Sequence, residues 1–108
     1  MSVTLQKILT LIAERKIHVS DHAYSELEKD DILPTEIIAN MQTALLVEDY
    51  PSAYRGPSVL LKCEDESGNP IRAVWGISNM GVDLAVLVKA YRPDTKKWTK
   101  DFLKRIKP

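Results

Sequence analysis

The chain has 108 residues, 44% of them hydrophobic and 28% charged, which suits one soluble domain with a single core. Its 15 basic and 15 acidic residues cancel, which excludes attraction of nucleic acid by net charge and leaves that role to local charge patches. With one cysteine, Cys63, no membrane-spanning stretch and no signal-peptide pattern, we expect a single cytoplasmic domain without an internal disulfide.

Apolar residues at helical spacing predict an amphipathic helix over Val3–Arg15. Ser2 or Thr4 is placed to cap its first turn, because a side-chain hydroxyl can accept a hydrogen bond from a free backbone N–H. The residues that follow, Ile17–Val19, are predicted to be a short extended link between this helix and the next.

A second helix is predicted from a cap at Ser20 or Asp21 to about Lys29. A third helix is predicted to start at Pro34, with Thr35 as its cap, and to direct its apolar residues toward the core. The first half of the chain is therefore predicted to be mainly helical.

Alternating apolar residues predict strands in the second half, with a short strand at Leu46–Tyr50 before three longer ones. The longer runs are Ser58–Glu64, Ile71–Ser78 and Val82–Arg92. After Pro93, the residues Trp98, Phe102 and Ile106 recur every four positions and predict a C-terminal helix. We therefore predict an α+β fold: N-terminal helices, then an antiparallel four-stranded sheet (a three-stranded meander plus one short strand) and a C-terminal helix.

The two predicted hairpin turns set the register of the meander. A three-residue loop at Glu66–Gly68, with Gly68 in the left-handed region, pairs Val59, Leu61 and Cys63 with Trp75, Ala73 and Ile71. A two-residue turn at Met80–Gly81 would place Trp75 opposite Val86 and bury both residues.

In this register Lys62, Arg72 and Lys89 form one row across three strands, on the face away from the core, which Tyr91 shares by parity. Like charges directly opposite each other destabilise a sheet, so such a row needs either side chains that splay into water or an anion over it. Our candidate phosphate-binding residues are Lys62, Arg72, Lys89, Arg55 and Arg92.

Most other chemistries lack the residues they need. One cysteine and two histidines, His18 and His22, do not complete a metal site, so we expect no metal and no cofactor. The four glycines are isolated and no nucleophile elbow is present. His22, at the start of the second predicted helix, is a candidate proton acceptor; the alternative is a partly buried side chain that ties the helix to the sheet.

Four short motifs stand in order along the chain: Ser-Asp-His-Ala at a helix start (Ser20–Ala23), Val-Glu-Asp-Tyr-Pro (Val47–Pro51), a Gly-Asn-Pro-Ile turn (Gly68–Ile71) and Ala-Tyr-Arg-Pro-Asp followed by Trp (Ala90–Trp98). Together they resemble the bacterial domain-of-unknown-function family 4258, over roughly residues 18 to 98. The resemblance implies a fold similar to RelE- and BrnT-type toxins, which are small metal-independent ribonucleases. It also implies RNA as the substrate and a small antitoxin-like protein as a partner.

The chain departs from that family at several positions. Four and eight residues after His22, where the family usually has arginines, it has Glu26 and Asp30. The strand position often held by histidine is Arg72, and the usual threonine near the end of the last strand is Lys89. Arginine and lysine can stabilise a phosphorane, but they are poor proton acceptors near neutral pH.

The sequence leaves two functions open. In the first, a RelE/BrnT-like toxin-type domain contacts RNA or another phosphate-rich ligand through the basic face, with metal-independent cleavage as an extension and His22 or Glu48 as the proton acceptor. The catalytic candidates are then His22, Arg72, Lys89 and Tyr91. In the second, the same fold is a non-catalytic protein-interaction module, which the acidic Glu26 and Asp30 favour.

Overall fold

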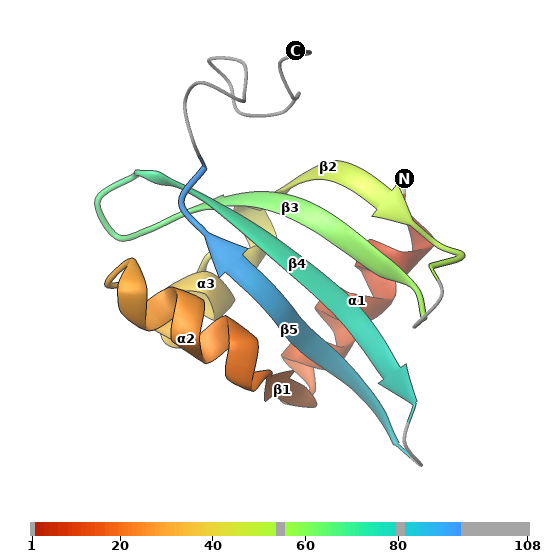
Figure 1. Ribbon diagram of the computed structural model, residues 1–108. Coiled ribbons are helices and arrows are strands. Elements are labelled where there is room, and N and C mark those ends of the chain that lie inside the picture. Colours follow the sequence, from red (N-terminus) through yellow and green to blue (C-terminus); the bar gives the residue numbers. More distant parts are fainter. Residues whose placement is uncertain (1, 54–55, 80–81, 94–108) are drawn as a thin grey trace.

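The computed structural model describes residues 2–53, 56–79 and 82–93, and within them the fold is α+β with a five-stranded mixed sheet and three α-helices (Figure 1). The strand order is β1-β5-β4-β3-β2. The helices are α1 (Val3–Ala13), α2 (Asp21–Lys29) and α3 (Pro34–Ala39), followed by a short 3₁₀ helix, η1 (Met41–Thr43). The strands are β1 (Ile17–Val19), β2 (Leu45–Tyr50), β3 (Ser58–Glu64), β4 (Pro70–Asn79) and β5 (Asp83–Tyr91).

The prediction of a four-stranded antiparallel sheet is wrong. The predicted link Ile17–Val19 is strand β1, which pairs in parallel with β5 and places Ile17 opposite Ala85. Three residues are too few to show an alternation, and the partner strand lies far along the chain, so no local signal marks this pairing. The predicted C-terminal helix lies outside the described residues.

The residue that caps the first turn determines where each helix begins. Ser2 Oγ accepts a hydrogen bond from Leu5 N at 3.0 Å, and Ser20 Oγ accepts one from Ala23 N at 3.1 Å, so Ser2 and not Thr4 caps α1, and Ser20 and not Asp21 caps α2. The prediction of Thr35 as the cap of α3 is wrong. Pro34 occupies the first helical position, so the cap is Leu33, whose backbone N–H donates to Glu36 Oε2 at 2.8 Å.

One face of the sheet packs against the helices to form the core. Trp75 is fully buried there, as predicted, in a cluster to which all three helices contribute. The buried members include Ile8 and Leu11 from α1, Ala23 and Leu27 from α2, Ile37 from α3, and Val59, Leu61, Ile71, Ala73, Ala85, Leu87 and Ala90 from the sheet. No described helix covers the opposite face, which we call the outer face and which is turned toward the viewer in Figure 1.

The predicted register of β3 and β4 is confirmed, with Val59 opposite Trp75 and Lys62 opposite Arg72. Gly68 has φ of 83° in the connecting turn, in the left-handed region that glycine adopts most readily.

The predicted register of β4 and β5 is wrong by one residue. Asn79 pairs with Asp83, so three residues and not two separate the strands, and Trp75 lies opposite Leu87 instead of Val86. The predicted turn residues Met80 and Gly81 themselves lie outside the described residues. This slip puts Leu87 in the core, where Val86 was expected.

Candidate functional site

The predicted row of three cations is only partly present. Lys62 and Arg72 lie directly opposite each other, but Arg72 faces Tyr91 and not Lys89. Lys89 is opposite Val74, because the register shifts by one residue at a bulge in β5. The first outer-face row is therefore Leu45, Lys62, Arg72 and Tyr91, and Lys89 belongs to the next row.

The bulge decides which way Lys89 points. Leu87 and Ala90 are both buried in the core, so the two residues between them, Val88 and Lys89, are both directed to the outer face. They are exposed, and Lys89 Nζ lies 5.2 Å from the centre of the Tyr91 ring. An ammonium over an aromatic face is a favourable cation–π contact, which joins the two rows.

Arg72 has an unexpected environment. Its register places it on the outer face, yet its side chain is fully buried. Its positive charge acts on Cys63, but desolvation of that thiol is the larger effect and raises the pKa of Cys63 to about 12. Arg72 is thus a charge held within the sheet layer rather than a side chain at the surface, and the reactive thiolate form of Cys63 is disfavoured.

A second bulge, in β2 between Leu46 and Glu48, brings a carboxylate to the outer face. Glu48 lies opposite Leu60, Leu60 lies opposite Val74, and Val74 lies opposite Lys89. The second outer-face row is therefore Glu48, Leu60, Val74 and Lys89. Rows two residues apart along a strand are separated by about 6.7 Å, and neighbouring strands by about 4.8 Å. Glu48 on β2 is therefore close to Lys62 on β3, while the backbones of Lys89 and Tyr91 on β5 lie three strand spacings, or about 14 Å, across the same face.

His22 is not part of this area. It lies in the first turn of α2, its side chain is 63% exposed, and its Nε2 is 3.4 Å from Glu26 Oε1. The exposed ring also does not fit the alternative of a partly buried link to the sheet. Of the predicted catalytic residues, the structure therefore places Arg72, Lys89 and Tyr91 on neighbouring strands and His22 apart from them, while Glu48, the alternative proton acceptor, lies on the same face of the sheet.

The other two candidate phosphate-binding residues lie elsewhere. Arg92 joins three segments: its backbone N–H donates to Asp30 Oδ2 at 3.0 Å, its Nε to the Asp30 carbonyl at 3.3 Å, and its Nη1 to Asp65 Oδ2 at 2.9 Å. These bonds tie the end of β5 to the end of α2 and to the β3–β4 turn. Arg55 lies outside the described residues.

Asp65 at that junction is held in its charged form. Hydrogen bonds from the backbone N–H of Asn69, from Arg92 and from the backbone N–H of Ser67 lower the pKa of its carboxyl, with desolvation opposing them. A carboxyl with a lowered folded-state pKa contributes stability above its unfolded pKa, and this contribution is lost as the pH falls through the folded value.

We expect Asp65→Asn to destabilise the protein at neutral pH, and the difference from the wild type to shrink as the pH falls below about 4, the unfolded pKa of aspartate. Urea denaturation at a series of pH values measures this difference. Glu66→Gln, which changes an exposed carboxylate in the same turn, is the control and should leave stability nearly unchanged. A difference that stays constant from neutral to acid pH would contradict the role of the Asp65 charge.

A comparison with known families places this sheet in context. The model of a family described as "Domain of unknown function (DUF4258)" matches residues 19–92. The chain belongs to the DUF4258 family. No curated protein and no solved structure matches the chain. The DUF4258 region runs from the end of β1 to the residue after β5, so it contains the first two outer-face rows.

Among residues 2–53, 56–79 and 82–93, no group of three or more His, Cys, Asp or Glu side chains is arranged to hold a metal ion. Over the same ranges, every helix is too short or too polar to cross a membrane.

Proposed function

We propose that this DUF4258 chain is a RelE/BrnT-like toxin-type domain that binds single-stranded RNA on its outer face and cleaves it without a metal ion. One observation carries the proposal: two neighbouring rows of the outer sheet face hold Glu48, Lys62, Lys89 and Tyr91 on the strands to either side of the buried charge of Arg72.

The binding step rests on charge and on an aromatic ring. The ammonium groups of Lys62 and Lys89 are suited to contact two phosphates of a single strand. The Tyr91 ring, beside Lys89, offers a surface on which a base can stack. The buried guanidinium of Arg72 strengthens the positive potential at this place, because charges in a low-dielectric environment act more strongly than charges in water.

The cleavage step uses the carboxylate that the β2 bulge supplies. Glu48 accepts the proton of a ribose 2′-hydroxyl, whose oxygen then forms a bond to the adjacent phosphorus. Lys62 stabilises the additional negative charge on the phosphorane, and the buried charge of Arg72 adds to this effect without contacting the phosphate. The bond from phosphorus to the 5′-oxygen breaks, and Tyr91 or Lys89 donates a proton to that oxygen. The products are a 2′,3′-cyclic phosphate and a free 5′-hydroxyl.

A second candidate function is favoured by the edge strand β2. Leu45 is 50% exposed, and Leu46 and Tyr50 are each 38% exposed. An edge strand with exposed apolar side chains can take up an extended segment of another protein as an additional strand. This observation favours a protein-interaction module, and it also offers a contact for the small antitoxin-like partner of the first proposal.

RNA titration tests the first function. We expect the double variant Lys62→Ala, Lys89→Ala to bind labelled single-stranded RNA more weakly and with a weaker salt dependence. Each lost phosphate contact lowers the slope of log K against log salt by about 0.7, so the double variant should lose about 1.4. Fluorescence anisotropy at several salt concentrations gives both slopes.

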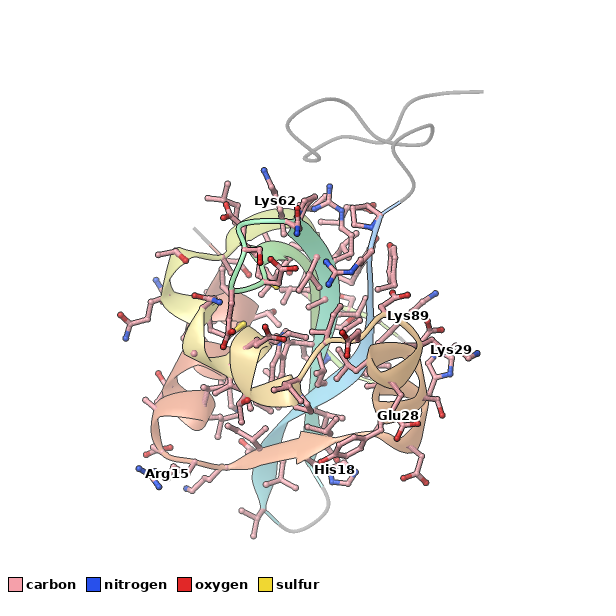
Figure 2. The ribbon with its side chains drawn as sticks, turned by 90° about the vertical axis from the view of Figure 1, so that its left-hand side faces the viewer. Arg15, His18, Glu28, Lys29, Lys62 and Lys89 are labelled. Atoms are coloured by element: carbon pink, nitrogen blue, oxygen red, sulfur yellow. The ribbon has the colours of Figure 1, made fainter. Side chains whose placement is uncertain are left out.

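The control for this experiment removes two cations from another surface. Arg15 and Lys16 follow α1 and are exposed, and Figure 2 shows Arg15 at the opposite end of the molecule from Lys62. The double variant Arg15→Gln, Lys16→Gln should keep the wild-type slope. Absence of RNA binding by the wild type at low salt, or equal slopes in all three proteins, would refute the proposed function and favour the protein-interaction module.

A further inference from the structure

A third outer-face row crosses all five strands. Tyr50 of β2 lies opposite Ser58, Ser58 opposite Gly76, Gly76 opposite Val86, and Val86 opposite His18 of β1. The row follows the one that contains Glu48 and Lys89. Figure 2 shows the same order, with Lys62 at one end of the molecule, His18 near the other and Lys89 between them.

An open hollow of about 960 Å³ lies partly over this row, and Ser58, Gly76, Val86 and His18 are among the residues that line it. Its lining also includes Val3, Thr4 and Lys7 of α1 and the core-side Ile77, so the hollow extends past the outer face toward the N-terminal end of α1. Its size is within the range of ordinary ligand sites, which run from about 300 to 1,000 Å³. The hollow exists in part because Gly76 has no side chain where its neighbours in the row have one. An added Cβ at this position would meet Val88 Cγ2 at 3.6 Å, the Pro57 carbonyl oxygen at 3.7 Å and Ser58 Cβ at 3.9 Å.

The lining has the chemistry of a site for a flat, uncharged ring. On the outer face, valines 74, 86 and 88 supply apolar surface, while His18 and the hydroxyl groups of Ser58, Ser20 and Ser78 supply polar groups. Asp83, the one acidic residue among the described lining residues, is paired with Lys7 at 2.7 Å. A nucleobase needs this combination of apolar faces and a few polar contacts at its edge.

We propose that this hollow binds a base of the same RNA strand whose phosphates contact Lys62 and Lys89. The inference rests on the proposed function and adds a base-binding subsite to it. The hollow and the cations are continuous on one face, because the His18 row and the Lys89 row are neighbours along β5. A phosphate at Lys89 therefore places an adjoining base over Gly76, with the His18 ring available to stack on it.

Two comparisons test this subsite. The first compares a six-nucleotide RNA with a six-residue abasic oligonucleotide that has the same number of phosphates; the wild type should bind the intact RNA about tenfold more tightly or better. The second uses Gly76→Val, whose side chain fills the floor of the hollow and whose Cβ fits at ordinary contact distances. This variant should bind the intact RNA as weakly as the wild type binds the abasic strand, and its affinity for the abasic strand should be unchanged.

The outcomes separate the subsite from the proposed function. If the wild type binds both oligonucleotides equally, the base-binding subsite is refuted but the proposed RNA binding is not. If the wild type binds neither oligonucleotide, both the subsite and the proposed function are refuted. Self-association of the wild type that is lost in Gly76→Val, with RNA affinity unchanged, would assign the hollow to a second copy of the chain and also refute the subsite. Should Gly76→Val not fold, His18→Ala takes its place and should selectively weaken binding of the intact RNA.

Discussion

Replacing Glu48 by glutamine should lower metal-independent RNA cleavage by about 100-fold or more, the usual size of the contribution of a positioned proton acceptor. The amide keeps the shape of the carboxylate but cannot accept the 2′-hydroxyl proton. RNA binding should persist, because the cations of the outer face are unchanged. Single-turnover cleavage of labelled single-stranded RNA in excess EDTA measures the rate, and anisotropy measures the binding.

The matched control is the next residue of the same strand. Asp49 lies opposite Val59, so it points to the other side of the sheet from Glu48, and Asp49→Asn should cleave at the wild-type rate. His22→Ala should also keep that rate, because His22 lies on α2 beside Glu26 and away from the outer face. Loss of cleavage in a folded His22→Ala variant, with Glu48→Gln still active, would instead restore the assignment that the sequence favours.

The hairpin of β3 and β4 could be predicted because its signals are local and agree with one another. The turn contains a glycine at the position that adopts positive φ, and Asp65 Oδ1 accepts hydrogen bonds from the backbone N–H groups of Ser67 and Asn69, both at 2.9 Å. The flanking strands place their larger apolar residues on one face, which fixes the register. The opposition of Lys62 and Arg72 follows directly from that register.

The register of β5 could not be predicted from its pattern, because the strand is apolar on both faces. Placing Val86 in the core and placing Leu87 there both give an apolar surface, so hydrophobicity does not choose between them. A bulge adds a further shift that no single residue marks. The parallel pairing with β1, a contact between distant parts of the chain, also helps to determine the position of β5.

The predicted row of cations therefore has the predicted face of the sheet but a different register. Lys89 lies on the outer face as predicted, but it does so because the bulge at Val88 reverses the effect of the one-residue slip. The burial of Arg72 was not predicted, since alternation assigns a residue to a face and does not report whether that face is solvated. Glu48 was named only as an alternative proton acceptor, because its place depends on the bulge in β2.

Replacing Trp75 by alanine should lower the free energy of unfolding by about 3–5 kcal/mol, the usual cost of removing a large aromatic side chain from a core. Trp75 is fully buried, at the centre of the face that packs against the helices, and its neighbours across the strands are Val59 and Leu87. Alanine would leave a cavity that these neighbours fill only in part. Urea denaturation of both proteins under the same conditions measures the difference.

Val74→Ala is the control. With it, the experiment tests which face of the sheet each side chain of β4 points to, as well as how tightly Trp75 is packed. Val74 is the preceding residue of β4, is only half-buried and points to the outer face, so its truncation should cost about 1 kcal/mol or less. Because successive side chains of a strand point to opposite faces, a shift of one residue would exchange the two results. If Val74→Ala lost more free energy of unfolding than Trp75→Ala, Val74 and not Trp75 would face the helices. Arg72 would then also face the helices, and the basis for an outer-face site would be lost.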